Sequence, residues 1–150
     1  MCIISIANNV ILRHGLVFFV SKLQSGLRTH NEHAWIVIQD QTYTATILRS
    51  FGDDDKKKIL MTLASNPKTI NNVLTKCNIP KTSGYRKINS LINNGLIDTC
   101  GFGHTEDYRK VPIYASIFSD LKIDFIKNKV TIKIRPNKVL EKHLAKTVVT

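Results

Sequence analysis

The chain has 150 residues, of which 43% are hydrophobic and 22% charged, a composition typical of a globular protein with one modest core. Its 22 basic and 11 acidic side chains give a net charge of +11, so its field should attract polyanions, with nucleic acid the leading candidate. The three cysteines, Cys2, Cys77 and Cys100, fit no zinc ribbon or disulfide framework, and we therefore expect a reducing, cytoplasmic setting.

The first fifty residues follow no clean hydrophobic period. Residues 16–20 and 34–38 have the composition of short strands. Three interpretations stay open for residues 1–50: a small β-rich or partly helical extension, a poorly packed segment, or a start codon placed too early. The longest apolar stretch, residues 10–20, is interrupted by Arg13 and His14 and is shorter than the ~20 residues that cross a bilayer, so we expect neither a membrane anchor nor a signal peptide.

A first helix is predicted from Asp53 onward. Three consecutive aspartates, Asp53 to Asp55, suit a helix N-terminus, where carboxylates accept from free N–H groups and favour the helix dipole. One face of this helix is apolar, and the pair Asn66-Pro67 ends it. The apolar positions are Ile59, Leu60, Leu63 and Ala64.

Two shorter helices should follow, joined by a tight turn. Thr69 is the expected N-cap of the second helix, and Thr82 that of the third, with Gly95 closing the third as a C′ residue. The turn is Asn78-Ile79-Pro80, with Ile79 filling the corner. Helical spacing predicts two buried stripes: Ile70, Val73, Leu74 and Cys77 on the second helix, and Tyr85, Ile88, Leu91 and Ile92 on the third.

The period then changes to that of strands. Residues 96–100 and 111–115 are predicted to pair across a long mobile loop, residues 101–110. A second hairpin is predicted from alternating residues 121–125 and 130–134 around the turn Lys127-Asn128-Lys129. Pro136 ends it, and a short C-terminal helix is expected from Val139, Leu140 and Leu144.

The segment TINNVLTKCNIPKTSGYRKINSLINNGLI, residues 69–97, resembles winged helix-turn-helix transcription regulators of the ArsR type, most closely those of archaeal type. The resemblance covers residues 53–115. It implies an α+β fold in which three helices are followed by a β-hairpin wing, here with an additional C-terminal β-hairpin and short helix. It also implies a recognition helix in the major groove, a wing near the DNA backbone or minor groove, and a homodimer. We therefore divide the chain into an N-terminal extension (1–50), a DNA-binding domain (53–115) and a possible dimerisation element (116–150).

The outward face of the third helix suits DNA, because it carries donors and small side chains and no carboxylate. Arg86 can reach a guanine edge and Asn89 can read adenine, whereas Lys81 and Lys87 suit phosphates. The remaining outward residues are Thr82, Ser83, Gly84 and Ser90. Arg109 and Lys110 in the wing are expected to contact the DNA backbone, but Glu106 and Asp107 at the wing tip would be repelled by phosphate.

No catalytic motif or metal-ligand spacing is recognisable, and we expect no enzyme activity, no metal and no cofactor. The sequence therefore predicts a sequence-specific regulator that binds duplex DNA as a homodimer. The alternative is a winged-helix module for protein–protein interaction, in which the third helix and the hairpin of residues 121–134 contact a partner. RNA binding is disfavoured because exposed aromatic platforms are not evident.

Overall fold

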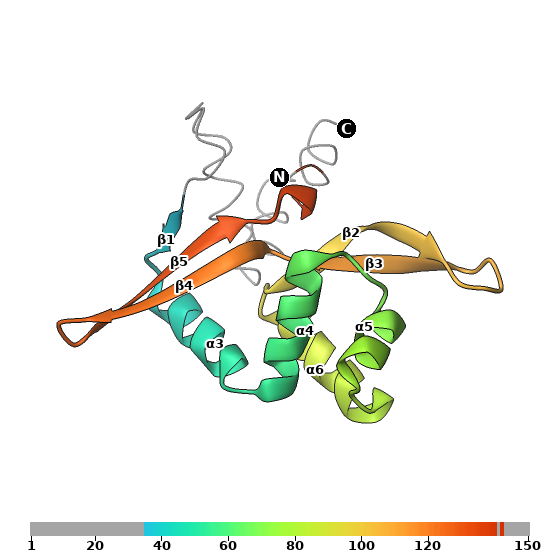
Figure 1. Ribbon diagram of the computed structural model, residues 1–150, viewed down its shortest axis with the longest axis horizontal. Coiled ribbons are helices and arrows are strands. Elements are labelled where there is room, and N and C mark those ends of the chain that lie inside the picture. The colour runs from blue at the N-terminus through green and yellow to red at the C-terminus, as the bar shows by residue number, and fades with distance from the viewer. Residues whose placement is uncertain (1–34, 141, 143–150) are drawn as a thin grey trace, which may run out of the picture.

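The computed structural model describes residues 35–140 and 142, which form an α+β fold with antiparallel sheets (Figure 1). The strand predicted at residues 16–20 and the contribution expected from Leu144 lie outside the described residues. A helical turn at residues 138–140 begins the expected C-terminal helix, and its Leu140 is buried. The elements are, in chain order, β1 (Ile36–Ile38), α3 (Gln41–Phe51), α4 (Asp54–Ser65), α5 (Ile70–Cys77), α6 (Lys81–Asn93), β2 (Ile97–His104), β3 (Lys110–Ser116), β4 (Phe118–Ile126) and β5 (Lys129–Pro136).

Side-chain caps begin three of the helices. Asp53 accepts from the backbone N–H groups of Asp55 and Lys56, and Thr69 accepts from that of Asn72, as the sequence predicts. Asp40 caps α3 in the same way, although the sequence analysis did not predict this helix. Each cap satisfies N–H groups that have no partner within the helix, and so fixes where the helix begins.

The helices α4, α5 and α6 enclose one core. The predicted apolar face of α4 is confirmed, with Ile59, Leu60 and Leu63 buried. Val73 and Leu74 of α5 are also buried, while Ile70 and Cys77 at the ends of the predicted stripe are half-buried and lie against the core. Between α5 and α6 the chain turns at Asn78, which has a φ of 55°, and the predicted corner residue Ile79 is buried.

The first sheet pairs β2 with β3 and is longer than expected. Pairing extends to His104 and Lys110, so the long mobile loop predicted at residues 101–110 is wrong and only residues 105–109 connect the strands. An irregularity between Thr99 and Gly101 shifts the register, and Gly101 there has a φ of 148°. The backbone of Lys68 adds an antiparallel bridge to Tyr114, with N···O distances of 3.0 and 2.9 Å, and this bridge ties the segment before α5 to β3.

The second sheet has the order β1-β5-β4. The predicted hairpin of β4 and β5 is confirmed, but its turn has two residues, Lys127 and Asn128, rather than three, and both have positive φ, at 50° and 59°. Ile36 and Ile38 of β1 lie opposite Ile134 and Ile132 of β5. Residues 34–38 therefore include a strand, as their composition suggests.

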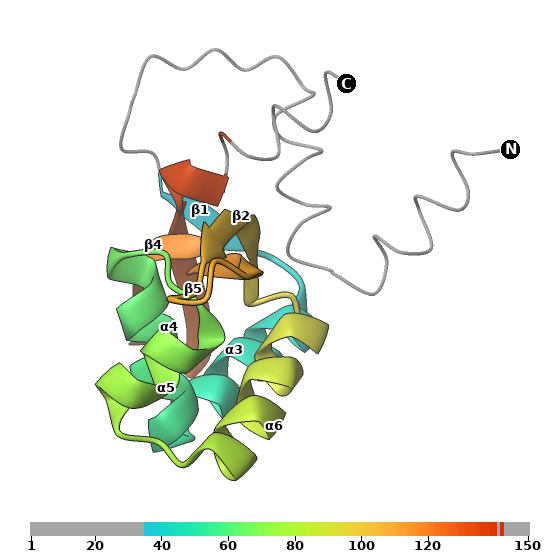
Figure 2. The same ribbon diagram turned by 90° about the vertical axis from the view of Figure 1, so that its right-hand side faces the viewer.

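The second sheet and α3 join the three-helix core. The Tyr43 hydroxyl of α3 donates to the carbonyl oxygen of Gly95 at 3.2 Å, a buried bond across 52 residues, and burial raises the Tyr43 pKa. Phe51 and Phe118 have ring centroids 6.3 Å apart. Figure 1 shows the two hairpins extending in opposite directions, and Figure 2 shows the helices α5 and α6 on the side away from β1.

Candidate nucleic-acid interface

The surface of α6 brings seven of the nine predicted contact residues onto one helix. Four of these seven side chains are exposed: Lys81, Thr82, Arg86 and Asn89. Ser83, Lys87 and Ser90 are half-buried. Gly84, which the sequence analysis also placed outward, is buried against α5, so that prediction is wrong.

The packing of α6 on α5 explains why Gly84 turns inward. A Cβ at Gly84 would lie 2.4 Å from Cδ2 of Leu74, so the two helices approach more closely than any larger residue would permit. The buried residues of α6 are Gly84, Ile88 and Leu91, at spacings of four and three. Tyr85 is consequently turned out of the core.

The predicted burial of Tyr85 is therefore wrong. Its side chain is 40% exposed, and its hydroxyl donates to Oδ1 of Asn71 on α5 at 2.9 Å. Tyr85 and Asn71 form a polar edge between α5 and α6, beside the exposed residues of α6. Asn71 is not among the predicted contact residues; the signal that could have indicated it is the polar pair Asn71-Asn72 in the first turn of α5.

Among the residues that the structure describes, no side chain caps the N-terminus of α6. The helix begins at Lys81, and Pro80 occupies the N-cap position without a side-chain hydrogen bond, so the predicted N-cap role of Thr82 is wrong. The Ser83 hydroxyl donates to the carbonyl oxygen of Pro80 at 3.3 Å rather than accepting from the backbone. N–H groups of the first helical turn that lack a protein partner, together with the helix dipole, favour an anion.

Lys87 lies between two carboxylates at the N-terminus of α4, those of the N-cap Asp53 and of Asp55. Its Nζ is 2.8 Å from Oδ1 of Asp53 and 3.0 Å from Oδ2 of Asp55. The hydrogen bond to Asp53, followed by that to Asp55, raises the Lys87 pKa. The same bond with Lys87 is the largest cause that holds the Asp53 pKa below its ordinary value. The α6 face carries no carboxylate of its own, but the carboxylates of Asp53 and Asp55 border it and neutralise Lys87.

A second contact joins the same two helices. Lys56 Nζ of α4 donates to the Ser90 hydroxyl of α6 at 2.9 Å. Ser90 is thus held from the side of α4, as Lys87 is. These contacts fix the orientation of α6 on the core, and the exposed side chains of Arg86 and Asn89 take no part in them.

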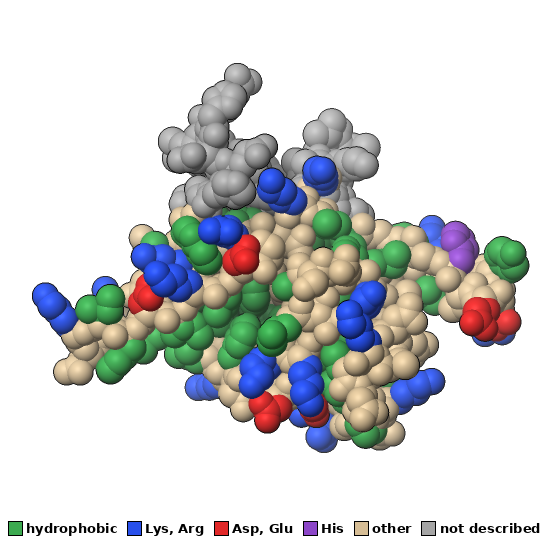
Figure 3. Space-filling view, in the orientation of Figure 1, with side chains coloured by type: hydrophobic (Ala, Val, Ile, Leu, Met, Phe, Trp, Pro, Cys, Tyr) green, Lys and Arg blue, Asp and Glu red, His purple; other side chains and the backbone are tan. Residues whose placement is uncertain are grey.

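The hairpin of β2 and β3 places Arg109 and Lys110 on its exposed end. Lys110 Nζ of β3 lies 4.3 Å from the centroid of the Phe102 ring of β2, a cation–π contact between the two strands of the hairpin. Two exposed acidic residues, Glu106 and Asp107, occupy the tip, and Figure 3 shows the acidic side chains there. Arg109 and Lys110 thus lie next to opposite charge.

Exposed aromatic residues on this hairpin were not predicted. Phe102 is 61% exposed and Tyr108 is 88% exposed. Tyr108 has a φ of 58° and its N–H donates to the carbonyl oxygen of Thr105 at 2.9 Å, in a compact tip closed by Thr105 and Arg109. Because β2 pairs with β3 as far as His104, the strand holds the Phe102 side chain on the surface. A loop at this position would not fix the direction of that side chain.

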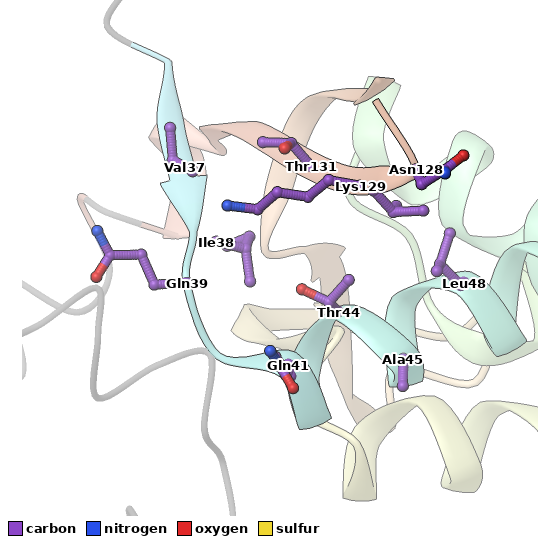
Figure 4. Close-up of a pocket in the computed structure, with 11 residues that line it drawn as sticks. Val37, Ile38, Gln39, Gln41, Thr44, Ala45, Leu48, Asn128, Lys129 and Thr131 are labelled. Atoms are coloured by element: carbon purple, nitrogen blue, oxygen red, sulfur yellow. The ribbon is translucent and has the colours of Figure 1, made fainter. Parts of the chain in front are cut away.

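A separate hollow of about 620 Å³ lies between α3, β1 and the start of β5. Figure 4 shows Lys129 extending across it from β5, above Thr44 of α3. Its walls mix amide, hydroxyl and apolar groups: Val37, Ile38, Gln39, Gln41, Thr44, Ala45, Leu48, Asn128, Lys129, Val130 and Thr131.

Within residues 35–140 and 142, no three His, Cys, Asp or Glu side chains are placed to hold a metal ion. Cys77 Sγ lies 3.4 Å from the Thr62 hydroxyl, and Cys100 Sγ donates to the carbonyl oxygen of Ile113 at 3.6 Å. Burial raises the pKa of the Cys100 thiol, which makes it a weaker nucleophile at neutral pH. None of the described helices has the length and apolar character of a bilayer-spanning segment.

Comparisons with known proteins include a weak likeness to a solved structure. No family model and no curated protein matches the sequence. The solved structure is the homodimeric winged helix-turn-helix DNA-binding domain of a possible ArsR-family transcriptional regulator from Mycobacterium bovis. It is 13% identical, the match covers 72% of this chain and 78% of that one, and the TM-score is 0.36.

Proposed function

We propose that this chain is a winged helix-turn-helix protein that binds duplex DNA sequence-specifically and regulates transcription in the cytoplasm. In this proposal α4, α5 and α6 are the three helices, α6 is the recognition helix, and β2 with β3 is the wing. The backbone bridge between Lys68 and Tyr114 supports the assignment, because it gives the wing a third antiparallel partner from the segment between the first two helices.

The observation that carries the proposal is the exposed face of α6. From Lys81 to Ser90 this helix has no carboxylate, and Lys81, Thr82, Arg86 and Asn89 are exposed. A helix of 13 residues is about 20 Å long and fits the major groove, which is ~12 Å wide. The chain's net charge of +11 would draw this face to a polyanion.

Each residue of the face has a proposed role. Arg86 donates to a guanine edge and Asn89 pairs with an adenine edge. Lys81, Thr82, Ser83 and the open helix N-terminus bind phosphates. Lys87 and Ser90 chiefly hold α6 against α4, since Lys87 is shared by Asp53 and Asp55 and Ser90 is bound by Lys56.

Arg109 and Lys110 of the wing are proposed to contact the DNA backbone. The acidic pair Glu106 and Asp107 would keep the tip itself away from phosphates. A homodimer would present two α6 helices to half-sites about one helical turn apart, or ~34 Å. No catalytic group, metal or cofactor takes part in this proposal.

The second candidate function is a protein-interaction module. The observation that favours it is the pair of exposed aromatic side chains on the β2–β3 hairpin, Phe102 and Tyr108, since aromatic residues are enriched where protein partners bind. The acidic tip beside them would then face a basic partner rather than DNA.

Titration of the full chain with a labelled random-sequence duplex at about 50 and 200 mM salt separates the two functions. If six to ten phosphates are contacted, the affinity should fall by about 10³ to 10⁵ between these concentrations. Selection of bound sites from a random duplex pool then tests sequence preference and half-site symmetry. Absence of duplex binding at the lower salt concentration would exclude the DNA-binding proposal.

A further inference from the structure

Strand β4 has a free edge. In the part of the chain that the structure describes, β4 is hydrogen-bonded to β5 on one side and to no strand on the other. Ile123 and Phe125, near the outer end of the strand, are 42% and 69% exposed. Figure 1 shows this hairpin extending past α3, and Figure 3 shows hydrophobic side chains along its lower side. A long apolar edge strand is a template for pairing with another strand.

The register of the hairpin determines which backbone groups face this edge. A two-residue turn, here Lys127 and Asn128, is flanked by a hydrogen-bonded pair, which is Ile126 and Lys129. Along the hairpin, hydrogen-bonded and non-hydrogen-bonded pairs then alternate. Leu121, Ile123 and Phe125 belong to the non-hydrogen-bonded pairs. Their N–H and C=O groups are therefore directed toward the free edge.

We propose that β4 pairs antiparallel with β4 of a second copy of this chain, about a two-fold axis at Ile123. In this register Lys122 of each copy lies opposite Asp124 of the other, so the two-fold axis creates two such pairs. Leu121 of each copy lies opposite Phe125 of the other. The proposal names the surface of the homodimer in the proposed function and does not require DNA binding.

Charge selects this register among its neighbours. If the two-fold axis moves by one residue along β4, either Lys122 lies opposite Lys122 or Asp124 lies opposite Asp124. Like charges directly opposite each other destabilise a sheet. Asp124 already lies 3.6 Å from Lys122 and 3.9 Å from Lys133 of its own chain. In the dimer each Asp124 would gain Lys122 of the other copy at a closely spaced, non-hydrogen-bonded pair.

The apolar face also becomes continuous in this dimer. Leu121, Ile123 and Phe125 share a sheet face with the buried Ile132 and Ile134 of β5. Pairing about Ile123 joins the exposed ends of two such faces and removes them from water, which favours association. Figure 1 shows the hairpin of β4 and β5 extending to the left, away from α6.

Exchange of charge tests this contact specifically. Lys122→Asp and Asp124→Lys each place like charges at both crossings, so each variant alone should dimerise at least about tenfold more weakly than the parent chain. An equimolar mixture of the two variants should form a heterodimer, because aspartates then face lysines at both crossings. The double variant should dimerise like the parent. Lys129→Asp, which makes the same charge change away from this edge, should stay within about twofold of the parent.

Sedimentation velocity of the full chain over a range of concentrations measures these constants, with circular dichroism as the check on folding. If a charge variant does not fold, Ile123→Pro replaces it, since the N–H removed faces the free edge and dimerisation should weaken. A parent chain that stays monomeric, or a dimer insensitive to these variants, overturns the proposal. Duplex binding is measured separately, and its loss would overturn the DNA-binding function without touching the β4 dimer.

Discussion

Gly84 of α6 lies directly against Leu74 of α5, and a Cβ at Gly84 would be 2.4 Å from Cδ2 and 2.8 Å from Cδ1 of that leucine. Leu74 is buried, so a movement of its side chain away from the contact would disturb the core around it. The close approach sets the rotation of α6 about its axis. It therefore decides which side chains of the helix face solvent, and places Arg86 and Asn89 on the surface.

Gly84→Ala should destabilise the protein by about 1–3 kcal/mol, because overpacking outweighs the gain of ~1 kcal/mol in helix propensity. Gly52→Ala is the matched control: a Cβ there meets only ordinary contacts at 3.5 Å, with a φ of −73°. That substitution should be neutral or stabilise by up to about 1 kcal/mol. Urea unfolding of both variants measures the difference, and equal effects would refute a special contact at Gly84.

Asp53 should contribute stability that depends on pH. Lys87 and the capped N–H groups lower its pKa in the folded protein below the ordinary 3.8, so the unfolded chain takes up a proton at higher pH than the folded one. The contribution is therefore complete above about pH 4 and lost as the pH falls through the folded-state pKa. Asp53→Asn, which keeps a capping oxygen, should cost about 0.2–1 kcal/mol at pH 7 and flatten the acid limb of stability against pH.

Comparison of Asp53→Asn, Asp53→Ala and Asp107→Asn separates the stability that Asp53 contributes as a helix cap from the stability that it contributes through its ion pair with Lys87. Asp53→Ala removes both and should cost about 1–2 kcal/mol. Asp107→Asn at the exposed hairpin tip is the control and should leave stability unchanged. Thermal or urea unfolding between pH 2 and 7 gives the curves. An Asp53→Asn acid limb as steep as that of the parent would contradict the role assigned to the Lys87–Asp53 pair.

Tyr43 should tie α3 to the turn that follows α6. Its hydroxyl donates to the Gly95 carbonyl oxygen at 3.2 Å in a buried setting, so Tyr43→Phe leaves that carbonyl without this donor and should cost about 1–3 kcal/mol. Tyr108→Phe at the exposed hairpin tip should have no measurable effect. Differential scanning calorimetry distinguishes the two. An unchanged melting temperature for Tyr43→Phe would mean that α3 contributes little to the stability of the helical core.

The features that the sequence predicted correctly depend on local chemistry. Asp53 and Thr69 cap helices through N–H groups two or three residues away, and Gly95 takes its positive φ of 69° where the third helix ends. The β4–β5 hairpin follows from strict alternation around a turn. These signals need no knowledge of distant partners.

The missed features depend on contacts between distant segments. Tyr85 fits an inward helical period, but the Gly84–Leu74 contact rotates the helix and exposes it. The ion pair of Lys87 with Asp53 joins residues 34 apart, so the pattern of α6 alone could not reveal it. Helix α3 begins with an Asp40 cap and buries Tyr43 and Ile47, yet its three threonines and its Tyr, Ile and Phe residues also suit a strand.

The residue-level test of the proposed function contrasts Arg86 with Lys81 on a duplex chosen by selection. Arg86→Ala should cost about 1–3 kcal/mol and relax the preference at one base pair, because a guanidinium that pairs with a base edge discriminates between bases. Lys81→Ala should weaken all duplexes alike and reduce the slope of log affinity against log salt by about one unit. Lys87→Ala should change the salt slope less than Lys81→Ala does, because Asp53 and Asp55 already neutralise its ammonium. Anisotropy titrations on selected and scrambled duplexes measure all three, and equal, sequence-independent losses from Arg86→Ala and Lys81→Ala would mean that α6 contacts only the DNA backbone.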